Sequence, residues 1–240
     1  MVHFEGNRIT MTSAKGSEQD GIHKDFSQTS LTEHLPSSAI AVVPDVESQP
    51  LQQGGTVPLN ARWTIWYDNP RLAPPGSDWK ENLQKCGSFD SVESFWRIFN
   101  NLKPASELTI NSNYSVFRYG VEPSWEDPAN TEGGKFVHTI IKKDSKLGKC
   151  DEGWLFTVLA VIGETMDESG DQVNGAVVSI RKQQDRIGLW LKSNDRDICR
   201  QIGERWKKIL KLEKTTLRYQ THRDAAASGR SFRNNAQFEV

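Results

Sequence analysis

The pattern of hydrophobic and polar positions changes near residue 55. Residues 1–55 are rich in Ser, Thr, Gln, Glu and Asp and hold one short apolar stretch, Ala39–Val43. No strand or helix period runs through them, so we predict a disordered N-terminal arm over residues 1–55. Beyond it, strand and helix periods predict a folded domain over residues 56–222. The polar residues 223–240 are predicted to form a flexible C-terminal segment.

Apolar residues that alternate with polar ones predict the strands of this domain. The segments with this pattern are 62–67, 114–119, 135–141, 175–182, 186–192 and 216–221. Between two of them, the tripeptide Gln183-Gln184-Asp185 predicts a hairpin turn. Strands paired through that turn would bring Arg181 and Arg186 close together.

Three segments carry the helical period of apolar positions. The first is predicted to begin with Asp90 as its cap, because Glu93 follows three residues later, and to end near Leu102. The other two span residues 151–164 and 195–212. Strands and helices do not alternate strictly, which predicts an α+β fold: a single antiparallel sheet with helices on one face.

The composition excludes several classes of protein. Hydrophobic residues make up 36% and charged residues 25%, as in soluble domains. The longest apolar run, Trp154–Gly163, is too short for a bilayer span, and no signal peptide is expected at the N-terminus. Cys86, Cys150 and Cys199 are widely spaced, so we expect neither a disulfide framework nor a zinc site, and a reducing compartment fits. We expect no cofactor and a cytoplasmic location that allows a nuclear fraction.

Charge is distributed unevenly along the chain. Seven acidic and three basic residues give residues 1–55 a net charge of −4, which leaves +3 for the remainder because the total is −1. A long nucleic-acid footprint needs a strongly basic face. The charge of this mildly basic domain is too weak to predict such a footprint, but it would allow a short anionic ligand.

Tryptophan is unusually frequent, with eight residues. Those in predicted strands and helices are expected to pack in the core. Trp79 and Trp125 instead lie in loops among Pro, Gly, Asp and Glu. Two loop indoles would suit a flat cationic ring held between them, and the Glu126 carboxylate could accept two hydrogen bonds from a guanine edge. Ordinary core packing is the alternative for both indoles.

The two arginines beside the hairpin turn suggest an anion site. The guanidiniums of Arg181 and Arg186 suit phosphate oxygens, although a solvated hairpin end explains them as well. Arg186 and Trp190 share a strand face by the period of two. No phosphate-binding loop, dinucleotide fingerprint or nucleophile elbow is present, and no carboxylate pair is singled out by its spacing. We therefore expect a binding module and not an enzyme such as a nucleotide hydrolase.

Several separated motifs resemble the messenger-RNA cap-binding translation initiation factor 4E family over residues 57–222. They are Trp63-x-x-Trp66, Trp79, Phe95-Trp96, Glu122-Pro123-Ser124-Trp125-Glu126-Asp127, Gly133-Gly134-Lys135, Gly153-Trp154, Gly175–Arg181 and Ile187-Gly188-Leu189-Trp190. The resemblance implies a curved antiparallel sheet of about eight strands with three helices on its convex face.

The resemblance also implies roles for particular residues. Trp79 and Trp125 would stack on 7-methylguanine, Glu126 would bond its N1 and amino groups, and Trp190 would touch its methyl group. Arg181 and Arg186 would hold the phosphates. Lys135 and Gln183 complete the expected cap-binding set, in which Gln183 replaces a common lysine. Asn113 stands where some members carry an aspartate.

A partner surface is implied on the convex face. There, family members bind a Tyr-x-x-x-x-Leu-apolar helix of the initiation scaffold factor or of repressor proteins. The matching residues are Val57, Pro58, Leu59, Val92, Trp96, Leu155, Phe156, Leu159 and Gly163. Phe156 replaces a frequent glutamate, which bears on the choice of partner. The implied function is recruitment of capped mRNA to translation initiation by a monomer; the alternative is a cap-binding repressor that does not engage the productive scaffold.

Overall fold

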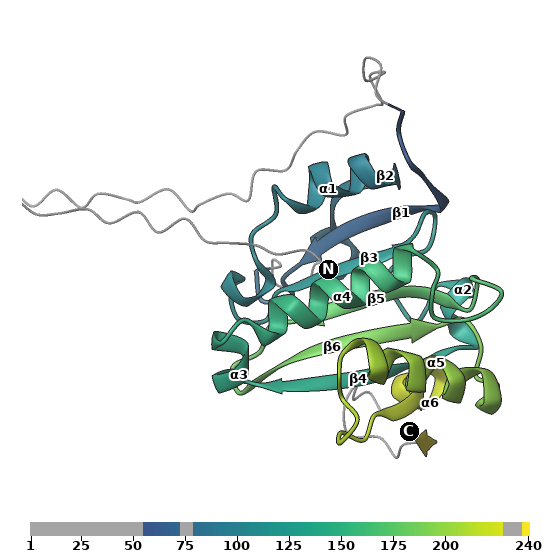
Figure 1. The fold of residues 1–240 in the computed structure, drawn as a ribbon. Helices are drawn as coiled ribbons and strands as arrows, with labels where there is room; N and C mark the ends of the chain where they lie inside the picture. Colours follow the sequence, from purple (N-terminus) through teal and green to yellow (C-terminus); the bar gives the residue numbers. More distant parts are fainter. Residues whose placement is uncertain (1–54, 73–78, 228–236) are drawn as a thin grey trace, which may run out of the picture. The chain divides into compact units, whose positions relative to one another are not determined.

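A computed structural model describes residues 55–72, 79–227 and 237–240, all within one compact unit, Ile40–Val240. Eight strands form one curved antiparallel sheet in the order β2-β1-β3-β5-β6-β4-β7-β8 (Figure 1). The strands are β1 Pro58–Asp68, β2 Gln84–Ser91, β3 Asn113–Arg118, β4 Gly134–Ile141, β5 Val173–Ser179, β6 Gln184–Leu191, β7 Arg218–Thr221 and β8 Phe238–Glu239.

Six α-helices and two short 3-10 helices lie between these strands in the described part of the chain. They are η1 Trp79–Asn82, α1 Val92–Phe99, η2 Ala105–Glu107, α2 Pro128–Thr131, α3 Lys142–Lys146, α4 Lys149–Ile162, α5 Arg196–Ile209 and α6 His222–Ala227. The longest, α1, α4 and α5, cross the same face of the sheet (Figure 1). The predicted α+β fold is confirmed. None of the described helices has the length and hydrophobicity needed to cross a membrane.

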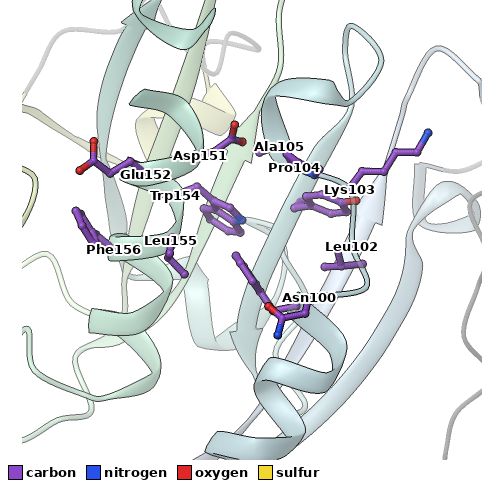
Figure 2. A pocket seen from close by; sticks show the side chains of 12 residues that line it. Asn100, Leu102, Lys103, Pro104, Ala105, Asp151, Glu152, Trp154, Leu155 and Phe156 are labelled. Atoms are coloured by element: carbon purple, nitrogen blue, oxygen red, sulfur yellow. The ribbon is translucent and has the colours of Figure 1, made fainter. Parts of the chain in front are cut away.

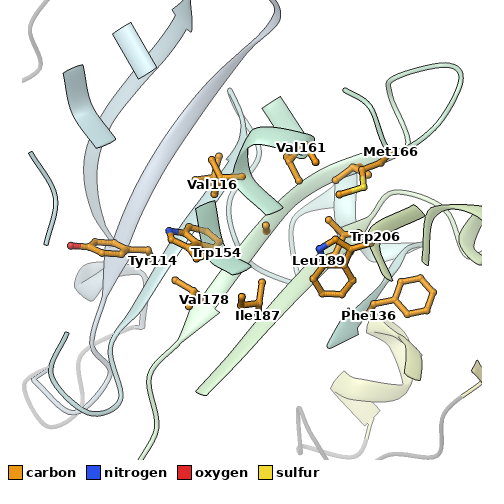
Figure 3. Packing of buried hydrophobic residues seen from close by; sticks show 14 of the residues in the cluster. Tyr114, Val116, Phe136, Trp154, Val161, Met166, Val178, Ile187, Leu189 and Trp206 are labelled. Carbon is orange, nitrogen blue, oxygen red and sulfur yellow. The ribbon is translucent and has the colours of Figure 1, made fainter. Parts of the chain in front are cut away.

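Alternation along the strands gives the sheet two different faces. Val116, Val178 and Leu189 are fully buried. Figure 3 shows them in one cluster with Trp154 of α4 and Trp206 of α5. The residues between them in the strands point to the opposite face, which none of the three long helices in the described part of the chain covers.

Helix α1 begins one residue later than the sequence predicts. Ser91, and not Asp90, is the cap: its hydroxyl accepts a hydrogen bond from the backbone N–H of Ser94, and the Ser94 hydroxyl accepts one from Ser91 N–H. Glu93, expected to close the capping box, instead accepts from the backbone N–H of Val57. A serine pair satisfies the same exposed N–H groups as a Ser–Glu box. The freed carboxylate of Glu93 ties the start of β1 to α1.

Trp206 joins α5 to α4. Its indole is fully buried, and its N–H donates to the hydroxyl of Thr157 at 3.0 Å. That hydroxyl donates in turn to the carbonyl of Gly153 at 2.7 Å. Both polar groups are thus satisfied in the core, where an unpaired donor would be costly. The spacing between the two helices is set by this contact.

The apolar residues of α4 divide between the core and the surface. Val158 and Ile162 are buried. Leu155 and Leu159 are half-buried on the outer surface of the helix. Because α4 is apolar around most of its circumference, periodicity alone does not select the side that faces the sheet.

Seven described elements were not predicted by the local pattern: β2, η1, η2, α2, α3, α6 and β8. All of β8, and all of α6 except its first residue, fall in the segment 223–240 that the sequence suggests is flexible. In β8, Phe238 is buried and stacks on Tyr219 at 4.8 Å between ring centroids. This short strand gains its stability from pairing with β7, which local sequence does not reveal. The predicted arm, apart from residue 55, lies outside the described residues.

Candidate functional site

A cavity of about 360 Å³ opens on the sheet face opposite the long helices. Strands β1, β3, β4, β5 and β6 supply most of its wall. The lining residues are Asp68, Leu83, Asn113, Ser115, Pro123, Lys135, Val137, Val177, Ser179, Arg181, Arg186, Gly188 and Trp190. The wall is therefore mixed: a basic region, an indole and several small polar side chains.

Strand register brings the cavity residues together in rows. Asn113 pairs with Ser179, and Ser179 with Arg186. Four residues beyond Arg186 on β6, Trp190 pairs with Lys135 on β4. Cross-strand partners have Cβ atoms roughly 5 Å apart, so each row is a nearly continuous line of side chains. The predicted common face of Arg186 and Trp190 is confirmed.

Three cations, Lys135, Arg181 and Arg186, line this cavity, and the pKa values of two of them are lowered by burial and by a neighbouring cation. Burial, together with the charge of Arg186, lowers the pKa of Lys135 to about 8. Burial and the charge of Arg181 lower the pKa of Arg186. Each group would gain from a bound anion, because an opposite charge offsets both burial and mutual repulsion. The cavity therefore has the electrostatics of an anion site.

The hairpin carrying these arginines differs slightly from the prediction. Gln184 and Asp185, expected in the turn, are already part of β6. Arg181 follows the end of β5 and lies in the connection, while Arg186 lies within the strand. Both still line the cavity, as the sequence predicted for a close pair. Gln183, by contrast, is exposed and is not among the lining residues.

Trp190 is 7% exposed and is held by neighbours on several sides. The ring of Phe117 meets it edge-on at 5.3 Å, and the ring of His222 lies at 4.2 Å, tilted by 34°. The ammonium group of Lys135 lies 5.4 Å from the indole centroid. A glycine at 175 leaves room for Phe117, since a Cβ there would lie 2.6 Å from its ring. The contacts with Phe117, His222 and Lys135 thus fix the orientation of the Trp190 indole.

Trp125 and Glu126 lie on the loop beside the cavity. The side-chain amide of Asn130 donates to the carbonyls of Glu122 and Ser124, which fixes the loop's path. The Ser124 hydroxyl donates to the carboxylate of Glu126. Trp125 is half-buried and Glu126 exposed. Neither lines the cavity, although their loop neighbour Pro123 does.

The remaining predicted base-stacking residue, Trp79, begins the short helix η1. Its side chain lies outside the described residues. Sequence reasoning from residue types missed Asp68, Ser115 and Ser179 as cavity residues. The period of two offered a signal for Ser179, which lies two residues before Arg181.

The predicted partner residues gather on the helix side of the sheet. All nine are exposed or half-buried, including the indole of Trp96. Residue Val57 lies beside α1, where its carbonyl accepts from the N–H of Val92 at 2.9 Å. Trp96 packs on Phe95 and Phe99 with ring centroids 4.9 and 5.9 Å away.

A second cavity of about 450 Å³ continues this surface between α4 and the segment after α1. Figure 2 shows Trp154 and Leu155 of α4 facing Leu102 and Pro104 across it. Phe156 lines it as well. The full lining is Phe99, Asn100, Leu102, Lys103, Pro104, Ala105, Tyr114, Asp151, Glu152, Trp154, Leu155 and Phe156. Its mostly apolar walls suit an apolar side chain of a bound protein.

Comparison with known proteins assigns this arrangement to a family. The family model described as eukaryotic initiation factor 4E matches residues 58–237. The chain belongs to the eukaryotic initiation factor 4E family. The family resemblance predicted from the tryptophan, glycine and arginine motifs is therefore confirmed.

Individual members of the family show the same relationship. The Saccharomyces cerevisiae initiation factor 4E is 45% identical over 155 residues, which are 65% of this chain and 71% of that protein. An Arabidopsis thaliana initiation factor 4E-1 is 37% identical over 97% of this chain and 87% of its own length. Among solved structures, C. elegans eIF4E-3 with the 4E-binding protein Mextli and a cap analog has a TM-score of 0.68 at 32% identity, over 78% of this chain and all of that chain. Ascaris suum eIF4E-3 with an m7G cap has a TM-score of 0.69 at 30% identity, over 78% and 98% of the two chains.

Proposed function

We propose that this chain binds the 7-methylguanosine cap of messenger RNA and brings capped mRNA to the translation initiation machinery through a scaffold partner. One observation carries the proposal: Lys135, Arg181, Arg186 and Trp190 line a single cavity on the open face of the sheet. An indole beside three cations matches a ligand that joins a flat base to phosphates. The cap-bound family members support the same ligand class.

The phosphates would bind where the cations converge. Arg181 and Arg186 present planar guanidiniums that suit paired phosphate oxygens. Lys135, with its lowered pKa, would regain its full charge beside an anion. The exposed Gln183 would add at most a weak contact at the rim.

The base would bind beyond the phosphates, toward the loop of Trp125. Trp79 and Trp125 would stack on the two faces of 7-methylguanine, whose positive charge strengthens contact with an indole. Glu126 would accept hydrogen bonds from N1–H and the amino group. The hydrogen bond that the Glu126 carboxylate now accepts from the Ser124 hydroxyl would then be replaced by bonds from the base or kept beside them. Trp190 would contact the N7 methyl group of the base at the bottom of the site.

The scaffold partner would dock on the helix side. An amphipathic helix laid across Trp96, Leu155 and Leu159 would bury these half-exposed side chains. Phe156 offers such a partner an apolar contact. It therefore favours an apolar partner residue at the position where a glutamate in other members would pair with a basic one. Ligand and partner thus occupy opposite faces, and we propose that a cytoplasmic monomer performs this function without catalysing a reaction.

Intrinsic tryptophan fluorescence during titration tests the proposal directly. Saturable quenching by 7-methyl-GTP, with much weaker quenching by GTP, is the expected result, because only the methylated base carries the positive charge that strengthens its contact with an indole. A folded sample quenched equally by both nucleotides, or by neither, would contradict cap binding.

Glu126→Ala isolates the readout of guanine. Because a neutral, shorter side chain cannot accept the two hydrogen bonds, affinity for 7-methyl-GTP should fall by about tenfold or more. Glu132→Ala serves as the control, because it removes another exposed carboxylate, one that pairs with Arg223 and does not line the cavity. Equal affinities of the two variants would exclude the role given to Glu126.

A further inference from the structure

Asp68 on β1 is joined to Arg181 through the side chain of Asn113. The amide nitrogen of Asn113 donates to Oδ2 of Asp68 at 2.8 Å. At its other end, the amide oxygen of Asn113 accepts from a guanidinium N–H of Arg181 at 2.8 Å. All three residues line the cavity, and Asp68 and Asn113 are direct cross-strand partners.

The chemistry of the two ends gives this chain of bonds a fixed direction. An ionised carboxylate only accepts hydrogen bonds, and a guanidinium only donates them. Asp68 therefore turns the nitrogen of Asn113 toward itself, which leaves the amide oxygen facing Arg181. Without an acceptor at position 68, only the donor at the Arg181 end would hold the amide in that orientation, and its nitrogen would lose its partner.

Further contacts restrict Arg181 on its other sides. Its guanidinium also donates to the backbone carbonyls of Ser112 at 3.2 Å and Ile180 at 3.0 Å. Its backbone N–H donates to Oδ1 of Asp185 at 3.1 Å. Of these three acceptors of the guanidinium, the amide oxygen of Asn113 is the only side-chain atom, so its orientation decides where the planar group rests.

We propose that Asp68 is a positioning residue: by orienting Asn113, it holds the Arg181 guanidinium in place for the ligand's phosphates. The inference rests on the proposed function and adds a residue to it. Asp68 itself does not contact the phosphates in this account, since a carboxylate would repel them. A guanidinium already held in its binding orientation loses less freedom when the ligand arrives.

The competing account is that the Asp68–Asn113 pair only stabilises the pairing of β1 with β3. The two accounts differ in which part of the ligand loses affinity. Positioning of Arg181 concerns the phosphates alone, so the nucleoside 7-methylguanosine should be unaffected. Loss of sheet stability would lower the affinity for nucleoside and nucleotide alike.

The experiment compares the full-length wild type with Asp68→Ala and Asp68→Asn. The measured quantity is the ratio of the dissociation constant of 7-methylguanosine to that of 7-methyl-GTP, obtained by fluorescence titration. Asp68→Ala should reduce this ratio by roughly 3- to 10-fold, as expected when the hydrogen bond that orients Asn113 beside Arg181 is lost. The affinity for the nucleoside should be unchanged. Asp68→Asn should restore most of the ratio, because an amide oxygen still accepts from Asn113.

Asp171→Ala is the matched control, since it removes another acidic side chain from a loop that does not line the cavity. It should leave the ratio unchanged. An unchanged ratio in Asp68→Ala overturns the inference while leaving cap binding intact. So does a parallel fall for both ligands, or a ratio that rises in both Asp68 variants, which would mark charge repulsion as the dominant effect. If the wild type does not bind 7-methyl-GTP, both the proposed function and this inference are refuted.

Discussion

His222 should make the folded protein progressively less stable below pH 6.5. The imidazole is 1% exposed and packs against Trp190, and neither ring nitrogen has a hydrogen-bond partner among the described residues. Burial, and then the charge of Lys135, lowers the pKa of His222 from 6.5 to about 3. The folded state therefore keeps the imidazole neutral at a pH where the unfolded chain is already protonated.

The sign and size of the effect follow from proton linkage. Between pH 6.5 and 3, the unfolded state binds a proton that the folded state does not bind, so the free energy of unfolding falls as the pH falls. Above pH 6.5, both states are neutral at His222 and the residue contributes no pH dependence. At pH 5, which is 1.5 units below the unfolded value, the loss is about 2 kcal/mol, since each pKa unit corresponds to about 1.36 kcal/mol.

Urea unfolding of the wild type and His222→Phe between pH 8 and pH 5 measures this loss. Phenylalanine keeps an aromatic ring against Trp190 and removes the titration. Any constant packing difference cancels, so the quantity compared is the change with pH. The wild type should lose about 2 kcal/mol more than the variant over this range.

His138→Phe is a useful control for the same titration. Burial also lowers the pKa of His138, but its side chain is only half-buried. We therefore expect a change in the same direction and of smaller size. If the stability curves of wild type and His222→Phe run parallel down to pH 5, the buried neutral imidazole is refuted.

Three further outcomes are expected. Binding of 7-methyl-GTP should weaken above pH 8 more in the wild type than in Lys135→Arg, because Lys135, with a pKa of about 8, loses its charge there; equal pH slopes by calorimetry would contradict this. Trp96→Ala should weaken binding of a scaffold-derived helical peptide by about tenfold or more and leave nucleotide quenching unchanged, whereas a parallel loss of both would mean that Trp96 is a core residue. Gly175→Ala places a Cβ 2.4 Å from the carbonyl oxygen of Val116 and 2.6 Å from the Phe117 ring, so it should cost about 1–3 kcal/mol, and an unchanged melting temperature would exclude this clash.

Local pattern predicted strands in which apolar residues recur at every second position. Strand β6 has an apolar residue at every second position from Ile187, and its bounds differ from the prediction by two residues at the start and one at the end. Strand β2, Gln84–Ser91, was missed because Gly87 and several polar residues interrupt the alternation. Its stability comes from pairing with β1, a contact that is distant in sequence.

The candidate site was predicted in part from residue types and in part from resemblance. The period of two placed Arg186 and Trp190 on one face, and a hairpin brought Arg181 near them. Lys135 was predicted as a site residue only through the family motif. Its strand, β4, pairs with β6, which is distant in sequence, so local pattern does not reveal that Lys135 lies beside Trp190. The base-binding roles of Trp125 and Glu126 remain predictions, since their side chains lie beside the cavity and do not line it.

The sequence by itself determined the family, the class of fold and which residues carry charge or an indole into the site. These depend on residue identity and on short-range spacing. Only the tertiary structure decided that Asp68, Asn113 and Arg181 form one chain of bonds, across separations of 45 and 68 residues. Alternation specifies the face on which a side chain stands, but the register between strands is set by the packing of the whole sheet, and register decides which side chains meet.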